Sequence, residues 1–261
     1  MLAANATGSK GFVWLLGAGP GAADLITMRG WKLLQAAEAV VYDELANDEL
    51  LNYCPPGCKL HAVGKRAGQH SASQREINTL LVTLAGAGKR VVRLKGGDPL
   101  VFGRAGEEIE ALRNAGLPFE IVPGVTAATA SAAVAGLPLT HRDYSSAVVF
   151  VTGHQCAANT SALDWGALAK LRATLCFYMG VRRLPEIAHN LLAHGMPADL
   201  PLALICEATL PTQKIVLTTL GGAETISADQ ISQPALVVIG EVVRLAEFAG
   251  QVPGLLSRAS L

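Results

Sequence analysis

The sequence predicts an α/β fold of two domains, with mostly parallel and mixed sheets. Short apolar runs alternate with segments of helical periodicity along most of the chain, and glycine-rich turns follow several of the apolar runs, as in GAGPGA at 17–22. The composition agrees, because 51% of the residues are hydrophobic, 16% are charged and 27 are glycine. Such a chain can bury a sizeable core and make tight turns. Ligands of open α/β sheets bind at the carboxyl ends of the strands, where these glycines lie.

The first half of the chain is predicted to alternate strands and helices. Helical spacing of apolar residues covers 25–37, and Ser73 with Glu76 forms a capping-box signature for a second helix. A third helix, from Glu107 to Asn114, is expected to stop before Gly116. Strands are expected at FVWLL (12–16), AVVYD (39–43), RVVRL (90–94) and FEIV (119–122). This order favours a mostly parallel sheet covered by helices.

The alternation of strands and helices is interrupted at PGVTAATA, residues 123–130, where a Pro-Gly turn leads into a helix of small residues. Small side chains permit close approach of another backbone or of a ligand. Further strands are expected at AVVFVTG (147–153), TLCFYMG (174–180), PLALIC (201–206), KIVLTTL (214–220) and PALVVIG (234–240). We therefore expect two domains joined near Pro123, residues 1–123 and 124–261.

Charge and hydropathy exclude two classes of partner. Lys plus Arg and Asp plus Glu each number 21, so the chain has no basic excess for coating nucleic acid. The most apolar long stretch, 125–139, is broken by Gly136 and Pro138 and falls short of the roughly 20 residues of a membrane helix. Residues 1–11 lack the features of a signal peptide. We expect a cytoplasmic protein that binds neither nucleic acid nor membrane.

The five cysteines do not predict a metal site. Cys54 and Cys58, with His61, are the best candidates, but the CPPGC turn that holds them lacks a second ligand pair at zinc spacing. Free thiols in a reducing compartment are the simpler interpretation, and no metal is predicted.

The turn after the first strand also fits a dinucleotide-binding fingerprint. Gly17, Gly19 and Ala22 satisfy G-x-G-x-x-G/A, and Asp43 lies near the position of the ribose-binding acid. Pro20 weakens that hypothesis because it has no N–H to offer a pyrophosphate. A purely structural turn is the other interpretation.

A second glycine site follows the strand at 90–94. Gly96 and Gly97 would let a ligand lie against bare backbone, and Asp98 can accept hydrogen bonds from it. Arg104 offers a fork that grips carboxylates. Glu107 and Glu108 open the next helix, where acids are favoured by the helix dipole in any case.

Five ordered motifs carry a family resemblance that covers about residues 12–245. They are LLGAGPGAADLITMRGWKLLQAAEAVVYD, VGKRAGQHSASQREIN, RLKGGDPLVFGRAGEE, PGVTAATASAAVAGLPLTHR and FYMG. Together they resemble the tetrapyrrole (class III) methylase family, and within it the enzymes that act on uroporphyrinogen III. The resemblance implies S-adenosylmethionine rather than NAD as the ligand, and a ligand cleft between two domains.

The resemblance also implies site residues. Cofactor contacts carry over to Pro20, Gly96, Gly97, Asp98, Val101, Thr126, Ala127, Met179 and Ala208, the last standing where glycine is common. Asp43 corresponds to a proton acceptor and Lys65 to a proton donor, while Arg104, Glu107 and Arg142 correspond to residues of the substrate cleft. The first domain is expected to hold the glycine loops and the substrate side, and the second to complete the cofactor site.

The implied reaction is methylation of uroporphyrinogen III at two pyrrole carbons to give precorrin-2, on the way to sirohaem, cobalamin or haem d1. Methyl transfer from a sulfonium leaves a cationic pyrrole, which a carboxylate can stabilise and deprotonate. The acetate and propionate arms of the substrate need cations. The family also implies a homodimer. Because the first strand begins near residue 12, we expect a stand-alone methylase without the fused module of some relatives. The alternatives are a methylase acting on a later precorrin, an NAD(P)-binding oxidoreductase, and a non-catalytic binding protein.

Overall fold

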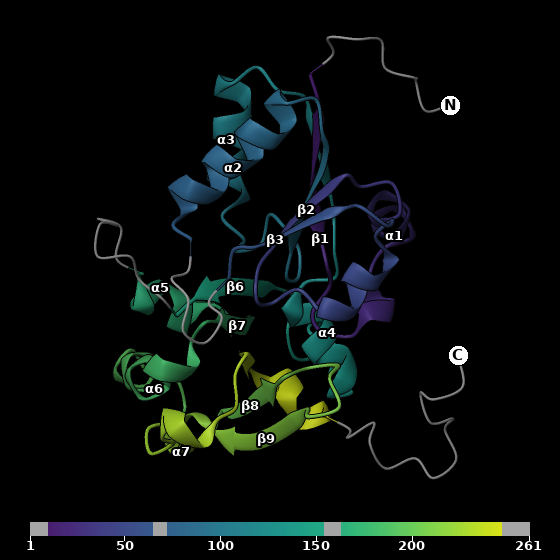
Figure 1. Cartoon of the computed structure of the whole chain (residues 1–261). Coiled ribbons are helices and arrows are strands. Elements are labelled where there is room, and N and C mark those ends of the chain that lie inside the picture. The colour runs from purple at the N-terminus through teal and green to yellow at the C-terminus, as the bar shows by residue number, and fades with distance from the viewer. Residues whose placement is uncertain (1–9, 65–71, 154–162, 247–261) are drawn as a thin grey trace. The chain divides into compact units, whose positions relative to one another are not determined.

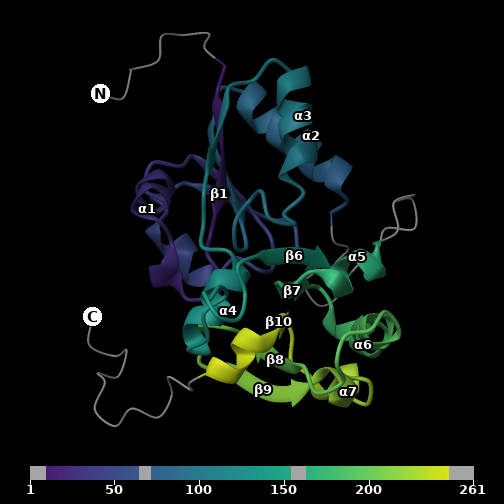
Figure 2. The same cartoon turned by 180° about the vertical axis from the view of Figure 1, so that it is seen from behind.

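A computed structural model describes residues 10–64, 72–153 and 163–246 of the chain (Figures 1 and 2). The chain divides into two compact units, residues 1–127 and 128–261. Within these described ranges, each unit contains one sheet with helices against it, so the α/β fold class predicted from the sequence is confirmed. No helix in these three ranges is long and apolar enough to cross a membrane.

In the described part of the first unit, the sheet has the order β3-β2-β4-β1-β5. Its strands are β1 (Phe12–Gly17), β2 (Ala39–Tyr42), β3 (Lys59–Ala62), β4 (Arg90–Lys95) and β5 (Phe119–Val122). All neighbouring strands are parallel. The chain therefore leaves every strand at the same edge of the sheet, and the loops after β1, β2, β4 and β5 gather there.

Helices cover both faces of this sheet (Figures 1 and 2). α1 (Met28–Leu34) packs on one face, and α2 (Gln74–Gly86) lies beside α3 (Ala105–Asn114) on the other. Because strand side chains alternate, Val13 of β1 belongs to the core under α2 and α3, whereas Leu16 belongs to the core under α1.

The helix starts follow capping chemistry. Ser73 accepts from Glu76 N at 3.3 Å while Glu76 Oε2 accepts from Ser73 N at 2.6 Å, which confirms the predicted capping box. The first helix is shorter than the expected span of 25–37. Thr27 accepts from Gly30 N and caps α1, so the residues before it form a separate short 3₁₀ turn.

The second unit holds a mixed sheet, with the order β6-β7-β10-β8-β9 in its described residues. The strands are β6 (Val148–Thr152), β7 (Thr174–Tyr178), β8 (Pro201–Cys206), β9 (Lys214–Thr219) and β10 (Ala235–Ile239). β6 and β7 are parallel, and the remaining neighbours are antiparallel. α5 (Trp165–Lys170), α6 (Leu184–Ala193) and α7 (Leu220–Ala223) pack on one face, and α4 (Ala127–Val134) packs on the other.

Candidate active site

The glycine loops after β1, β4 and β5 meet backbone to backbone at the carboxyl edge of the first sheet. Gly19 and Gly97 exchange two hydrogen bonds, at 2.6 and 3.2 Å. A Cβ added to Gly17 would lie 2.6 Å from the Cα atom of Gly124, and one added to Gly124 would lie 2.2 Å from the Gly97 carbonyl oxygen. No side chain fits at Gly17 or Gly124, so the sequence needs glycine there for the loops to approach.

Gly96 and Gly97 serve different purposes. A Cβ on Gly96 would lie 2.5 Å from Leu45 Cβ, so this glycine makes room for the loop after β2. Gly97 has φ +68°, and the nearest described atom to an added Cβ is Ala127 N at 4.0 Å. The bare backbone open to a ligand is therefore at Gly97, with Ala127 at the start of α4 beside it.

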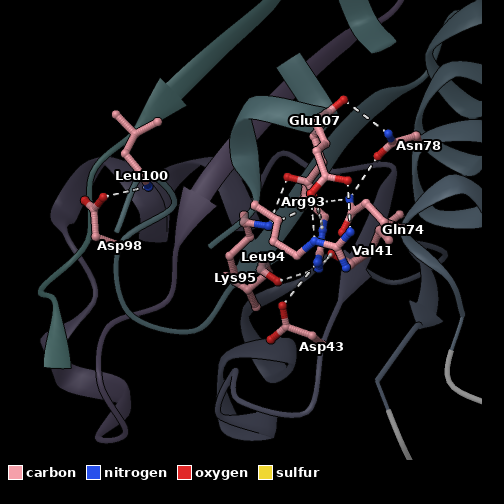
Figure 3. Close-up of polar contacts among 12 residues, drawn as sticks. Val41, Asp43, Gln74, Asn78, Arg93, Leu94, Lys95, Asp98, Leu100 and Glu107 are labelled. Atoms are coloured by element: carbon pink, nitrogen blue, oxygen red, sulfur yellow. Dashed lines mark hydrogen bonds and ion pairs between the residues drawn. The ribbon is translucent and has the colours of Figure 1, made fainter. Parts of the chain in front are cut away.

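Asp98 ties two of these loops together. Its Oδ1 accepts from Leu100 N at 2.8 Å, and its Oδ2 accepts from Gly124 N at 3.0 Å (Figure 3 shows the contact with Leu100). Val101 N donates to the Asp98 carbonyl at 3.3 Å. The sequence suggested Asp98 as an acceptor for a ligand. In the structure each oxygen already accepts a backbone bond, so the carboxylate first fixes the shape of the loop that presents Gly97.

A charged cluster lies on the α3 side of the same edge (Figure 3). Arg93 and Lys95 of β4 are each 3% exposed, and Glu108 of α3 is fully buried. Glu108 Oε1 accepts from Arg93 Nε at 2.9 Å and from Lys95 Nζ at 3.0 Å. Burial and the neighbouring guanidinium lower the pKa of the Lys95 ammonium, whereas Glu108 opposes that shift. Buried charges of this kind are tolerated only because they are paired.

Asp43, directly after β2, joins this cluster. Its Oδ2 accepts from Arg93 Nη2 at 3.1 Å. Its Oδ1 is buried and finds no hydrogen-bond partner among the described residues. The side chain as a whole is 28% exposed. Asp43 thus combines one fixed oxygen with one that is available to a donor from a ligand.

Arg104 and Glu107 form a forked ion pair at the start of α3. Arg104 Nε and Nη2 donate to the two Glu107 oxygens at 2.7 and 2.9 Å, and both side chains are at least half exposed. These hydrogen bonds lower the pKa of Glu107, with a smaller contribution from Lys95. Arg104 has φ 57°, a left-handed conformation that costs energy for a residue with a side chain.

The expected site residues of the second unit also lie in strained loops after strands. Met179 follows β7 with φ 52° and is 55% exposed. Ala208 follows β8 and is buried between Glu207 at φ 46° and Thr209 at φ 72°. Such backbone strain clusters at functional sites. Arg142 is exposed in the loop before β6.

Three further residues are expected at the site from the sequence. Pro20 is half-buried in the loop after β1, and Thr126 directly precedes α4. Lys65 lies outside the described residues.

Sequence reasoning missed the roles of Arg93 and Lys95, and it explained Glu108 only as a charge at a helix start. A signal was present, because the central strand of a parallel sheet is normally apolar on both faces. Two cations at alternate positions of β4 must point to the same face, and a buried acid has to meet them.

The metal alternative gains no support from the thiols. Burial, reinforced by the neighbouring Cys58, raises the pKa of the Cys54 thiol to about 12, and burial also raises the pKa of Cys58. Within the ranges described, no three His, Cys, Asp or Glu side chains gather as a metal site.

Curated relatives of this chain include sirohaem synthases. The chain is 51% identical over 237 residues to "Siroheme synthase 1" of Yersinia enterocolitica, covering 91% of this chain and 50% of the relative. It is 50% identical over 233 residues to "Siroheme synthase" of Zymomonas mobilis, covering 89% of this chain and 49% of the relative. The chain therefore spans about half the length of these relatives.

The chain also matches solved structures over nearly their whole length. Uroporphyrin III C-methyl transferase from Thermus thermophilus is 38% identical, with a TM-score of 0.76 over 90% of this chain and 100% of that one. The same enzyme complexed with S-adenyl homocysteine gives a TM-score of 0.77. A cobalt precorrin-4 methyltransferase is 30% identical, with a TM-score of 0.78 over 89% of this chain and 95% of that one. The family model for Tetrapyrrole (Corrin/Porphyrin) Methylases matches residues 13–224. The chain accordingly belongs to the tetrapyrrole (corrin/porphyrin) methylase family.

Proposed function

We propose that this chain transfers methyl groups from S-adenosylmethionine to two pyrrole carbons of uroporphyrinogen III, giving precorrin-2 for sirohaem, cobalamin or haem d1 synthesis. The observation that carries the proposal is the 38% identity to the Thermus uroporphyrin III C-methyl transferase, whose whole length the chain covers. The cobalt precorrin-4 methyltransferase is less similar in sequence, at 30% identity. We also propose that the 261 residues of this chain are sufficient by themselves for this methylation.

The loops of the first unit fit a bound S-adenosylmethionine. Gly97 leaves a face of backbone that no described side chain covers, and Asp98 holds the loop in that shape. Pro20, Val101, Thr126 and Ala127 lie on the same three loops or at the start of α4, and we assign them to the cofactor with Gly96 as a support. When bound, the cofactor supplies a methyl group on a positively charged sulfur. We assign Met179 and Ala208 of the second unit to it as well, on the resemblance and their strained loops.

Carboxylates and cations of this chain suit the substrate. Asp43 has a buried oxygen available to a pyrrole N–H, and Glu107 is kept ionised by Arg104. Either carboxylate can stabilise the cationic pyrrole and take up its proton. Arg104, Arg142 and Lys65 are the cations that we assign to the acetate and propionate arms, with Lys65 as a proton donor.

The direct test is to incubate the pure protein with uroporphyrinogen III and S-adenosylmethionine labelled in the methyl group. Two labelled methyls per tetrapyrrole are expected, and mass spectrometry of the product counts them. A parallel reaction offers a cobalt-precorrin substrate. Methylation of that substrate alone would place the chain with the later methylases, and cofactor binding without turnover on either would make it a binding protein.

We further propose that the chain is a cytoplasmic homodimer without nucleic-acid or membrane partners, as the resemblance and the neutral composition suggest. Sedimentation equilibrium at several protein concentrations tests the dimer, and a monomer throughout that range would contradict it.

A further inference from the structure

The buried charges beside the candidate site are arranged in a chain of contacts. Asp43 follows β2 and Arg93 lies on β4, the strand beside β2. Glu108 reaches the same face of the sheet from α3. Arg93 and Lys95 supply two positive charges, and Asp43 and Glu108 supply two negative ones, so the charges balance. Asp43 is assigned to the substrate under the proposed function, whereas Glu108 has no assigned contact with substrate or cofactor.

All three nitrogens of the Arg93 guanidinium donate hydrogen bonds. Its Nε donates to Glu108 at 2.9 Å, its Nη1 donates to the carbonyls of Leu94 at 3.1 Å and Val41 at 3.4 Å, and its Nη2 donates to Asp43 at 3.1 Å (Figure 3). A planar guanidinium with every nitrogen engaged has a single orientation. The geometry of the hydrogen bond from Nη2 to Asp43 is therefore set by the contacts that Nε and Nη1 make on the other sides of the guanidinium.

Glu108 is the anchor of those contacts. It is fully buried on a helix and binds both cations, and Gln74 of α2 donates to its Oε1 at 3.4 Å. If Glu108 were replaced by a neutral residue, the two cations Arg93 and Lys95 would remain side by side. Asp43 would then be the one acidic side chain left in this cluster. Arg93 would then turn toward solvent or toward the vacated site, and its fork would no longer fix Asp43.

We propose that Glu108 is a positioning residue, which fixes Arg93 so that Arg93 holds one oxygen of Asp43 and leaves the other, Oδ1, free to accept the pyrrole N–H of the substrate. Oδ1 is buried and has no hydrogen-bond partner among the described residues, and a buried polar atom left without a partner costs free energy. A donor from the substrate would satisfy it, and the Arg93 contact fixes the other oxygen of the same carboxylate. The inference rests on the proposed function, because it needs a substrate with an N–H donor.

The test is a double-mutant cycle in the full chain, measuring kcat with uroporphyrinogen III and S-adenosylmethionine both saturating. Asp43→Asn is expected to lower kcat about 100-fold, the scale of a positioned acid–base group. Glu108→Gln is expected to lower kcat about tenfold through misplacement of Asp43. Because Glu108 acts through Asp43, the double variant should be no slower than Asp43→Asn alone.

Glu110→Gln is the matched control, since Glu110 is an exposed acid on the same helix and the substitution is the same. Its kcat should stay within twofold of the unaltered protein. If Glu108→Gln does not fold, the double variant Glu108→Gln with Lys95→Met is used in its place, because it removes one negative and one positive charge. Its kcat is then compared with that of Lys95→Met alone.

The outcomes separate the two proposals. Losses that multiply in the double variant, or a normal kcat with a lowered melting temperature in Glu108→Gln, would overturn the positioning role while the proposed function stands. An unaltered protein that methylates no tetrapyrrole would overturn the proposed function and the role of Asp43 with it.

Discussion

In the ion pair of Arg104 and Glu107, one exposed side chain changes the pKa of another. The hydrogen bonds from Arg104 lower the pKa of Glu107, so Glu107 stays ionised at pH values where an ordinary glutamate takes up a proton. A depressed carboxyl pKa stabilises the folded state above the unfolded-state pKa, and that contribution is lost as the pH falls through the folded-state pKa. Because both side chains are at least half exposed, the effect on stability is small and the effect on chemistry is the one to measure.

Glu107→Gln is expected to lower the rate of methylation about 100-fold, because the substitution keeps the shape but removes the charge that faces a cationic pyrrole. Binding of the tetrapyrrole and of S-adenosylmethionine should survive. Single-turnover kinetics and calorimetry measure the two quantities separately. Near-normal turnover with a lowered melting temperature would reduce Glu107 to a favourable charge at a helix start and leave Asp43 as the leading base.

Arg104→Ala is expected to raise the pKa of Glu107 toward the ordinary glutamate value, since the donor that stabilises the carboxylate is lost. Carboxyl ¹³C NMR titration of Glu107 measures this shift directly. Arg113→Ala, which removes an exposed cation near the other end of α3, should leave the titration unchanged. The same Arg104 variant should methylate at least about tenfold more slowly, because a lost charged hydrogen bond costs roughly 1.5–3 kcal/mol. An unshifted Glu107 would show that the fork does not persist in solution.

At the scale of the element, the parallel sheet decides where the loops meet. Three glycine-containing loops leave β1, β4 and β5 at one edge and approach within hydrogen-bond distance. Gly17 and Gly124 allow this approach, and Asp98 locks it. Of these four positions, Gly97 is the one whose backbone no described side chain covers. A substitution at Gly17, Gly124 or Asp98 would therefore disturb the loops themselves, whereas one at Gly97 would reach the space open to a ligand.

Gly97→Ala is expected to weaken S-adenosylmethionine binding about tenfold or more, because a methyl group at φ +68° would project from the bare backbone face. The conformational cost of a side chain at positive φ is about 1–2 kcal/mol. Gly57→Ala is the matched control, because Gly57 has φ +89° with no atom within 4 Å and lies in the turn before β3. Both variants should lose similar stability in urea unfolding, whereas calorimetry should find weakened binding in Gly97→Ala alone. Equal affinity in the two variants would remove Gly97 from the cofactor site.

At the scale of the whole molecule, the two units have separate sheets and separate cores. A ligand that binds only the folded chain raises its stability by mass action. The family membership favours S-adenosylmethionine as that ligand, and it does not favour the oxidoreductase alternative that the first glycine turn allowed.

S-adenosylmethionine at 100 times its dissociation constant is expected to stabilise the chain by about 2.7 kcal/mol. Differential scanning fluorimetry over a range of cofactor concentrations detects the corresponding rise in melting temperature. NADH over the same concentrations should produce no rise. Stabilisation by NADH without any by S-adenosylmethionine would restore the dinucleotide interpretation.

Patterns within a short window of sequence determined much of the fold. Neighbours a few residues apart determine the strands that begin at residues 12, 39, 90 and 119. They also determine the capping box at Ser73 and the small-residue helix after Pro123. β3 escaped prediction because it is a short edge strand with mostly exposed side chains, and such a strand lacks an apolar signature.

The sequence by itself also determined the family, since five long motifs stand in order along the chain. Only the tertiary structure decided which residues of those motifs are in contact. Asp43 and Arg93 are 50 residues apart and meet because β2 and β4 are neighbours in the sheet, and Glu108 reaches them from a helix. Propensity and periodicity act locally, whereas the pairing of buried charges depends on which distant elements the fold packs against one another.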